Sequence, residues 1–197
     1  THEFYDSPNS FGELLFNDFY DWLIYLIQLS EKLNYEWYIK LHPDTDFFTV
    51  QTIENLFINK KKFKVLNSDI SFHEIYENNI KIALTCYGSI GHELPLLGFS
   101  VINAGTNPHI GYNFNENPKN LEDYKSLLLN LEKIKSRKIN YNEIYEFYYM
   151  HYLYTSDDNV QDFKFFDNFL NNEDINITNI KKFIKQINPK LHLNLNN

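Results

Sequence analysis

The chain has 197 residues, a formal net charge of −8 and 43% hydrophobic residues. This length fits one domain or one large lobe, and the hydrophobic fraction is sufficient for a substantial core. Nucleic-acid binding requires clusters of Lys and Arg that neutralise phosphates. The only basic run is Lys60-Lys61-Lys62, so the composition argues against a nucleic-acid partner.

Cys86 is the single cysteine, and it lies in an apolar run. No disulfide and no paired-cysteine zinc site can therefore form within the chain, and we predict a reduced, cytoplasmic setting with Cys86 as a small buried side chain. No stretch approaches the roughly 18 consecutive apolar residues of a membrane-spanning helix. The first residues also lack the pattern of a signal peptide.

The first element that the sequence predicts is a helix over 12–33, with Ser10 as its N-cap. Its apolar residues recur at steps of four and three, which places them on one face; they are Leu15, Phe19, Trp22, Leu26, Leu29 and Leu33. A strand follows over 36–41. It should end at His42-Pro43, because proline cannot donate a hydrogen bond to a sheet.

Further along the chain, predicted strands continue to alternate with helices. A helix begins after Gly88-Ser89 and closes at Gly98, where helices commonly take a left-handed residue. We expect Pro95 to bend this helix. The other predicted elements are a helix over 49–59, a strand over 63–66, a helix over 71–78 opened by a capping box, strands over 81–87 and 100–104, a loop over 105–119, and helices over 121–131, 141–154 and 177–187.

Strands that alternate with helices predict a mostly parallel sheet with helices on both faces. The predicted fold class is therefore α/β, a Rossmann-like doubly wound sheet flanked by helices. We expect this lobe to span residues 1–155, with a helical and irregular extension over 156–197 packed on the same domain.

In such sheets, ligands bind beyond the carboxyl ends of the strands. Three segments should follow strand ends: His42-Pro43, Gly88-Ser89 and Gly105-Thr106-Asn107-Pro108-His109. We expect all three to lie on one rim of the sheet and to form a single cleft for a nucleotide.

Gly88 and Ser89 are candidates for binding a phosphate group. Gly88 lets a ligand approach the backbone, and Ser89 can cap the helix whose free N–H groups favour an anion. Glu93, one turn further on, can accept hydrogen bonds from ribose hydroxyls. The alternative is an ordinary Ser-capped turn followed by a surface Glu.

Two histidines could contact the same ligand. His42 could donate to a phosphate or leaving-group oxygen, or act as an acid or base; alternatively, it is a loop His bonded to a backbone carbonyl. His109 lies in a loop longer than a connector needs and could contact a sugar or phosphate; the alternative is a solvated ring. We interpret His92 as structural and Asp157-Asp158 as a solvated turn. We predict no metal site and no cofactor.

Four stretches resemble the bacterial capsule and surface polysaccharide transferases, a group that includes capsule Kdo transferases, polysialyltransferases and teichoic-acid polymerases. The stretch that ends in His42-Pro43 resembles the HP motif of this group. The stretch from Thr85 to Ile102 resembles a segment in which GS or GT is followed by a Glu and then by LG.PVI. The stretches are Tyr38-Ile39-Lys40-Leu41-His42-Pro43, Thr85 to Glu93 followed by Leu96 to Ile102, Gly105 to Phe114, and Phe16 to Leu23. The commoner small residue and Lys are replaced by Pro95 and Phe99.

The resemblance implies a GT-B fold, in which two Rossmann-like lobes enclose the active site, and this chain is similar to the C-terminal, donor-binding lobe. His42, the catalytic candidate, and Ser89 would contact the donor phosphate, and Glu93 would hold the ribose. Pro43, Gly88, Gly105, Thr106 and His109 would complete the site. The donor would be a CMP- or UDP-linked sugar bound without a metal.

The resemblance also implies partners. These are the nucleotide-sugar donor, a glycan or glycolipid acceptor, and an N-terminal lobe, not in this chain, that supplies the base and the acceptor site. Such an enzyme would work at the inner face of the cell membrane. Two other functions stay open, a nucleotide-sugar epimerase of the same fold and a non-catalytic interaction or regulatory domain. In an interaction domain, the apolar face of the Tyr-rich helix would dock a partner. Trp22 is interpreted as a core residue or as lobe-contact surface.

Overall fold

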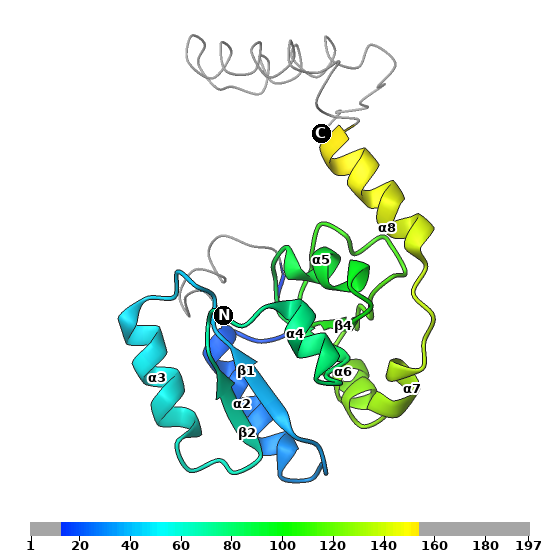
Figure 1. Ribbon diagram of the computed structural model, residues 1–197. Helices are drawn as coiled ribbons and strands as arrows, with labels where there is room; N and C mark the ends of the chain where they lie inside the picture. Colours follow the sequence, from blue (N-terminus) through cyan, green and yellow to red (C-terminus); the bar gives the residue numbers. More distant parts are fainter. Residues whose placement is uncertain (1–12, 154–197) are drawn as a thin grey trace, which may run out of the picture. The chain divides into compact units, whose positions relative to one another are not determined.

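The computed structural model of the chain describes residues 13–153 (Figure 1). The chain divides into two compact units, residues 1–145 and 146–197, and each is considered by itself. In chain order the elements are α2 (Phe19–Ser30), β1 (Trp37–Lys40), α3 (Phe47–Phe57), β2 (Phe63–Leu66), α4 (Phe72–Glu77), β3 (Ile82–Thr85), α5 (Ile90–Leu96), β4 (Ser100–Asn103), α6 (Leu121–Leu128), α7 (Leu131–Lys135), α8 (Tyr141–Tyr148) and the π-helix η1 (Tyr149–Leu153).

The four strands form two parallel pairs. β1 pairs with β2 from Trp37↔Phe63 to Lys40↔Leu66. β3 pairs with β4 from Ile82↔Ser100 to Thr85↔Asn103. Each pair is joined by one helix, α3 or α5, which is the connection that parallel strands require. The fold is therefore mixed α/β with parallel strand pairs. In the described part of the chain, the two pairs are separate ladders.

A third extended segment lies along the other edge of β4. Ile102 and Glu116 form a parallel bridge, in which the Asn103 N–H donates to the Glu116 carbonyl (2.9 Å) and the Glu116 N–H donates to the Val101 carbonyl (2.9 Å). β4 is thus flanked on both edges, and all four of its residues are buried. Because the bridge is parallel, the chain leaves residue 116 toward the same edge at which β4 ends.

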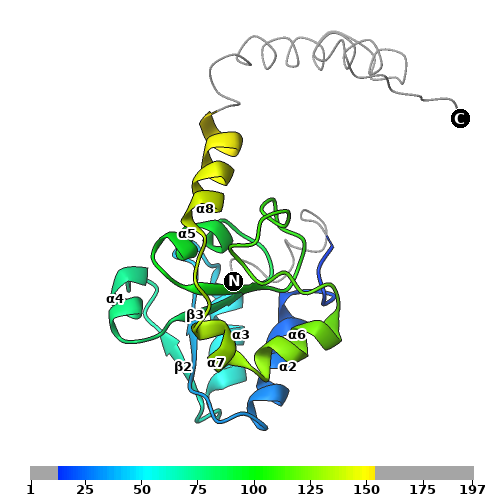
Figure 2. The same ribbon diagram turned by 90° about the vertical axis from the view of Figure 1, so that its right-hand side faces the viewer.

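Alternate side chains of β4 enter two different apolar clusters. Ile102 belongs to the larger cluster, which contains residues of α2, α3, α6 and α7. Val101 belongs to the smaller one, with residues of α4 and α5. Helices therefore cover both faces of the β3–β4 pair. On the larger side, the Trp22 indole N–H donates to the Tyr124 hydroxyl (2.8 Å), and α2 and α6 lie side by side (Figure 2).

Several helices, among them α2 and α4, start at a side-chain cap. Asp18 accepts from the Asp21 N–H at 2.7 Å, so α2 begins at Phe19, seven residues later than its predicted start at 12; the predicted cap Ser10 lies outside the described residues. The predicted cap at Ser71 is confirmed at α4, where the Ser71 hydroxyl accepts from the Glu74 N–H at 3.1 Å. These bonds satisfy N–H groups that have no partner within the helix.

The C-terminal helices are shorter than the sequence predicts. The helix predicted over 121–131 is divided into α6 and α7, and α8 ends at Tyr148, where the π-helical turn begins. The extension over 156–197, the helix over 177–187 and Asp157-Asp158 all lie outside the described residues. Between residues 13 and 153, no helix is both long and apolar enough to cross a membrane.

Candidate functional site

The loops after β3 and β4 are held together by one buried amide. Asn107, 2% exposed, donates through Nδ2 to the Cys86 carbonyl (3.1 Å) and to the Gly105 carbonyl (3.0 Å). Its Oδ1 accepts from the Gly88 N–H (3.1 Å). Asn107 is not among the predicted site residues, although Asn in a Gly/Pro-rich loop commonly hydrogen-bonds to nearby backbone. Two of the three expected rim segments are thereby brought together.

Gly88 is required by its backbone conformation. Its φ is +143°, a region that L-residues rarely adopt, and an added Cβ would meet nothing within 4 Å. Among residues 13–153, no atom lies on the side of Gly88 where a Cβ would stand. A glycine in this conformation can let a ligand approach the backbone. The predicted phosphate contact at Gly88 stays a prediction.

Ser89 and Glu93 lie on the first turn of α5 with exposed side chains. The Glu93 N–H donates to the Ser89 carbonyl at 3.0 Å, so the two residues are one helical turn apart. Ser89 holds the N-cap position but makes no side-chain cap bond. The predicted cap is therefore wrong: Ser89 has helical φ and ψ, whereas a capping side chain needs an extended backbone. Its hydroxyl is left facing solvent.

Gly91 brings α5 into direct contact with loop 105–117. A Cβ on Gly91 would lie 2.4 Å from Cε1 and 2.6 Å from Nε2 of His109, distances that Cβ atoms do not reach without displacement of the ring. The Asn115 side-chain amide donates to the Gly91 carbonyl at 2.5 Å. A glycine is thus needed here for close packing, which the sequence analysis did not predict.

His109 is fully buried. Its Nε2 lies 3.0 Å from Nδ2 of Asn103 and accepts from it when the proton is on Nδ1. Burial, with a smaller contribution from His92, lowers the pKa of His109 to about 4, so the ring is neutral near pH 7. The solvated alternative is excluded. Direct contact with a sugar or phosphate would require the loop to open.

His92, Cys86 and Gly105 also serve packing. His92 is buried and its ring stands edge-on to His109, with centroids 5.6 Å apart. Cys86 is 1% exposed, and burial raises the pKa of its thiol. At Gly105, an added Cβ would lie 2.6 Å from Leu14 Cδ2. Of the three residues that this loop was predicted to contribute to the site, Gly105, Thr106 and His109, only Thr106 is exposed.

His42 lies in a different environment, at the end of β1. Its side chain is 48% exposed. Nδ1 accepts from the Asp44 N–H at 3.1 Å, so the neutral ring has its proton on Nε2. Pro43 is exposed beside it. Since β1 and β3 belong to separate ladders, the sheet does not set the distance between His42 and the other two rim segments.

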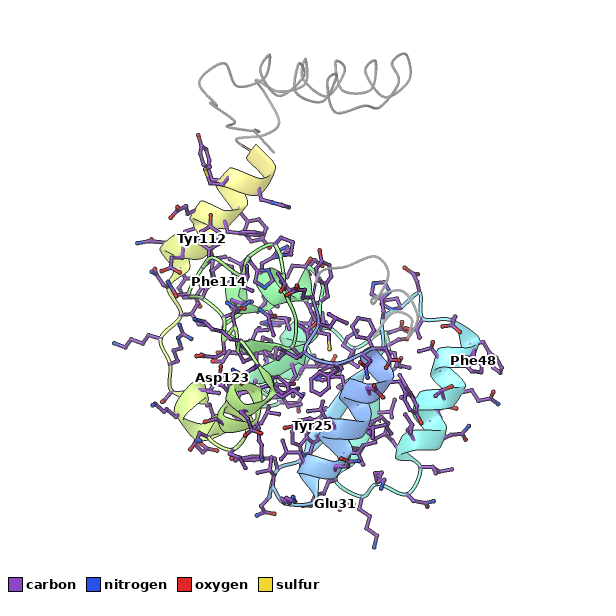
Figure 3. The ribbon with its side chains drawn as sticks, turned by 180° about the vertical axis from the view of Figure 1, so that it is seen from behind. Tyr25, Glu31, Phe48, Tyr112, Phe114 and Asp123 are labelled. Carbon is purple, nitrogen blue, oxygen red and sulfur yellow. The ribbon has the colours of Figure 1, made fainter. Side chains whose placement is uncertain are left out.

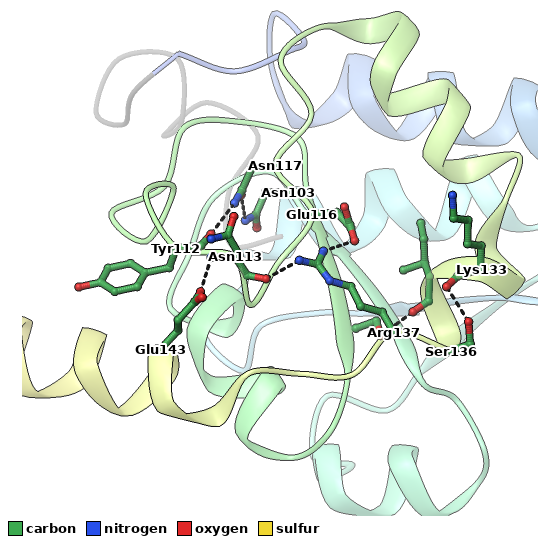
Figure 4. Close-up of polar contacts among 11 residues, drawn as sticks. Asn103, Tyr112, Asn113, Glu116, Asn117, Lys133, Ser136, Arg137 and Glu143 are labelled. Carbon is green, nitrogen blue, oxygen red and sulfur yellow. Dashed lines mark hydrogen bonds and ion pairs between the residues drawn. The ribbon is translucent and has the colours of Figure 1, made fainter.

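A groove of about 450 Å³ lies between residues 116–119 and the side chains of Asp123, Ser126 and Leu127 on α6. None of the predicted site residues lines it. One wall is anchored on both sides (Figure 4): Arg137 binds the Glu116 carboxylate and the Asn113 carbonyl, and the Asn103 amide donates to Asn117 Oδ1 at 2.7 Å. Nothing in the local sequence indicates this groove, because its walls meet only after folding.

No protein-family model, no curated protein and no solved structure matches the chain. Within residues 13–153, no group of three or more His, Cys, Asp or Glu side chains could hold a metal ion. The predicted metal-free donor site stays a prediction.

Proposed function

We propose that this chain is the donor-binding lobe of a glycosyltransferase that builds capsule or surface polysaccharide from a nucleotide-activated sugar. The observation that carries the proposal is the edge where parallel strands β3 and β4 end. There, Asn107 ties together two loops beside an open Gly88, and the exposed Ser89 and Glu93 stand one turn apart. Such edges are where α/β folds bind ligands.

The same proposal extends to the fold. A Rossmann-like doubly wound sheet requires strands that are buried on both faces. The alternation of Ile102 and Val101 between two apolar clusters, with helices on each side, supports this arrangement around β4. The two parallel pairs would then be halves of one sheet.

Each proposed contact follows from the chemistry of the side chain. The Ser89 hydroxyl can donate to a phosphate oxygen that approaches over Gly88, and the Glu93 carboxylate can accept from two ribose hydroxyls. His42 would donate from Nε2 to the phosphate and stabilise the leaving nucleotide. A second lobe would supply the catalytic base and the site for the acceptor, a glycan or glycolipid, at the cytoplasmic face of the membrane.

The proposal is tested by thermal unfolding of the chain with millimolar CMP or UDP. One of the two nucleotides should raise Tm, because a ligand that binds only the folded state stabilises it. Glu93→Gln should remove the shift. Glu54→Gln, an exposed carboxylate on α3, is the matched control and should preserve it. If neither CMP nor UDP raises Tm, the proposal is overturned.

A second candidate is a non-catalytic interaction domain, favoured by the aromatic residues that begin α3. Phe47 is 80% and Phe48 56% exposed, and Phe48 points away from α3 (Figure 3). Exposed large apolar side chains that lie together can mark a contact with another protein. Sedimentation distinguishes the two: a tight dimer that Phe47→Ser disrupts, with no nucleotide-induced shift, would favour this function.

A further inference from the structure

The groove beside α6 opens at the same edge as the proposed donor site. The segment at Glu116 runs parallel to β4 through the bridge with Ile102. Residues 117–119 therefore continue toward the edge where the carboxyl end of β4 lies. The groove is therefore on the far side of β4 from Gly88. Neighbouring strands are about 4.8 Å apart, which places the groove roughly 10 Å along the edge from the loop after β3. A ligand with two linked rings can span that distance.

The groove has the side chains that bind a hydroxylated ring. Lys119 is exposed and has no hydrogen-bond or ion-pair partner among residues 13–153, so its ammonium group can donate. The Asp123 carboxylate, whose Oδ2 accepts from Asn120 Nδ2 at 3.0 Å, and the exposed Ser126 hydroxyl can accept from a ligand. Pro118 and the half-buried Leu127 supply apolar surface. Sugar rings have this combination, with hydroxyls at the rim and C–H groups on the faces.

The wall that carries Lys119 is fixed. Asn117 Oδ1 accepts from the buried Asn103 amide, and Arg137 binds the Glu116 carboxylate and so neutralises it. Across the groove, α6 begins with a capped turn, in which the Asn120 side chain accepts from the Asp123 N–H at 2.9 Å. A ligand would meet preformed walls and would lose little affinity to ordering them.

We infer that this groove is a sugar subsite, which binds a pyranose ring by its hydroxyl groups. The inference rests on the proposed function only for the identity of the molecule that carries the ring, either the nucleotide-sugar donor or the growing glycan. The nucleotide would lie over Gly88, and the sugar would lie across β4 against Lys119, Asp123 and Ser126.

The test is a binding titration of the full chain, followed by NMR, with pairs of probes: UDP against UDP-glucose, and CMP against CMP-N-acetylneuraminate. Ser126→Trp places a large ring in the groove from an exposed helical position. We expect it to cost about tenfold in affinity for the nucleotide sugar, as two lost hydrogen bonds would, and to leave binding of the bare nucleotide unchanged. Lys125→Trp, exposed next to it on α6 but not in the groove wall, is the control.

Lys119→Met provides a second variant, which keeps an unbranched side chain, one atom shorter, and removes its charge. It should weaken nucleotide-sugar binding in the same direction as Ser126→Trp. Far-UV circular dichroism checks that both variants fold.

A parallel arm uses free glucose, N-acetylglucosamine and N-acetylneuraminic acid in saturation-transfer NMR. A glycan would be the source of the ring if free sugar binds, if Ser126→Trp abolishes that binding, and if nucleotide sugars bind no more tightly than the bare nucleotides. If no nucleotide binds but free sugar binds in the groove, the proposed function fails and the subsite stands. If nucleotides bind and Ser126→Trp changes neither nucleotide-sugar nor free-sugar binding, the subsite is overturned and the proposed function stands. No binding in either arm overturns both.

Discussion

The turn after β1 and the paired loops after β3 and β4 all follow parallel strands, but they are stabilised differently. At His42, two bonds stay within the turn: Nδ1 accepts from Asp44, and the His42 carbonyl accepts from Thr45. At Asn107, bonds reach 19 and 21 residues back along the chain to Gly88 and Cys86. A local turn should tolerate substitution of its side chain, whereas loops that depend on each other should not.

Gly91→Ala should have the largest effect on stability. The added methyl group would overlap the buried His109 ring and cost about 3 kcal/mol of unfolding free energy. Urea denaturation measures it. Gly111→Ala is the control, since a Cβ there meets nothing within 4 Å, and it should change stability by less than about 0.5 kcal/mol. Equal effects of the two substitutions would show that α5 does not pack closely on loop 105–117.

Asn107→Ala should come next, with a loss of about 2 to 3 kcal/mol, because it leaves the Cys86 carbonyl and the Gly88 N–H without the side-chain bonds that hold them. Hydrogen exchange of the Gly88 amide should also accelerate. Thr106→Ala, an exposed neighbour whose bond to Glu13 is made by its backbone, should do neither. Unchanged exchange at Gly88 in the Asn107 variant would show that the two loops are held independently.

The buried His109 should lower the free energy of unfolding in mild acid. Its pKa is lowered from 6.5 to about 4 in the folded state, so below the unfolded pKa the unfolded chain binds a proton that the folded chain does not. Stability from this residue is complete above pH 6.5 and is lost as the pH falls toward 4, by about 2 kcal/mol at pH 5. Urea unfolding at several pH values measures it. His109→Gln should flatten this part of the profile, and an identical profile would contradict the assignment.

His42→Ala should have the smallest effect on stability, under about 0.5 kcal/mol, because the ring is half-exposed and its turn retains the carbonyl bonds from Thr45. It should nevertheless remove most of the Tm shift produced by CMP or UDP. His73→Ala, another exposed imidazole, on α4, controls for loss of the ring. A large destabilisation by His42→Ala would show that the turn after β1 depends on its side chain as strongly as the loops joined by Asn107 do.

Much of the fold could be predicted from local patterns. The apolar face of α2, the Ser71 cap and the left-handed Gly98 each depend on neighbours within one or two turns of the chain. The alternation of strands and helices likewise predicted parallel pairs. Short-range hydrogen bonds and apolar spacing decide these features, so they can be seen in the sequence.

For the candidate site, the sequence determined which residues follow the strands, among them Gly88, Ser89 and Glu93. Only tertiary structure decided that Asn107 would bridge two loops, that His109 would be buried against Gly91, and that a groove would open beside Lys119. The physical reason is that these features arise from contacts between segments distant in the chain. Burial and pairing across such distances depend on how whole elements pack, which no local spacing specifies.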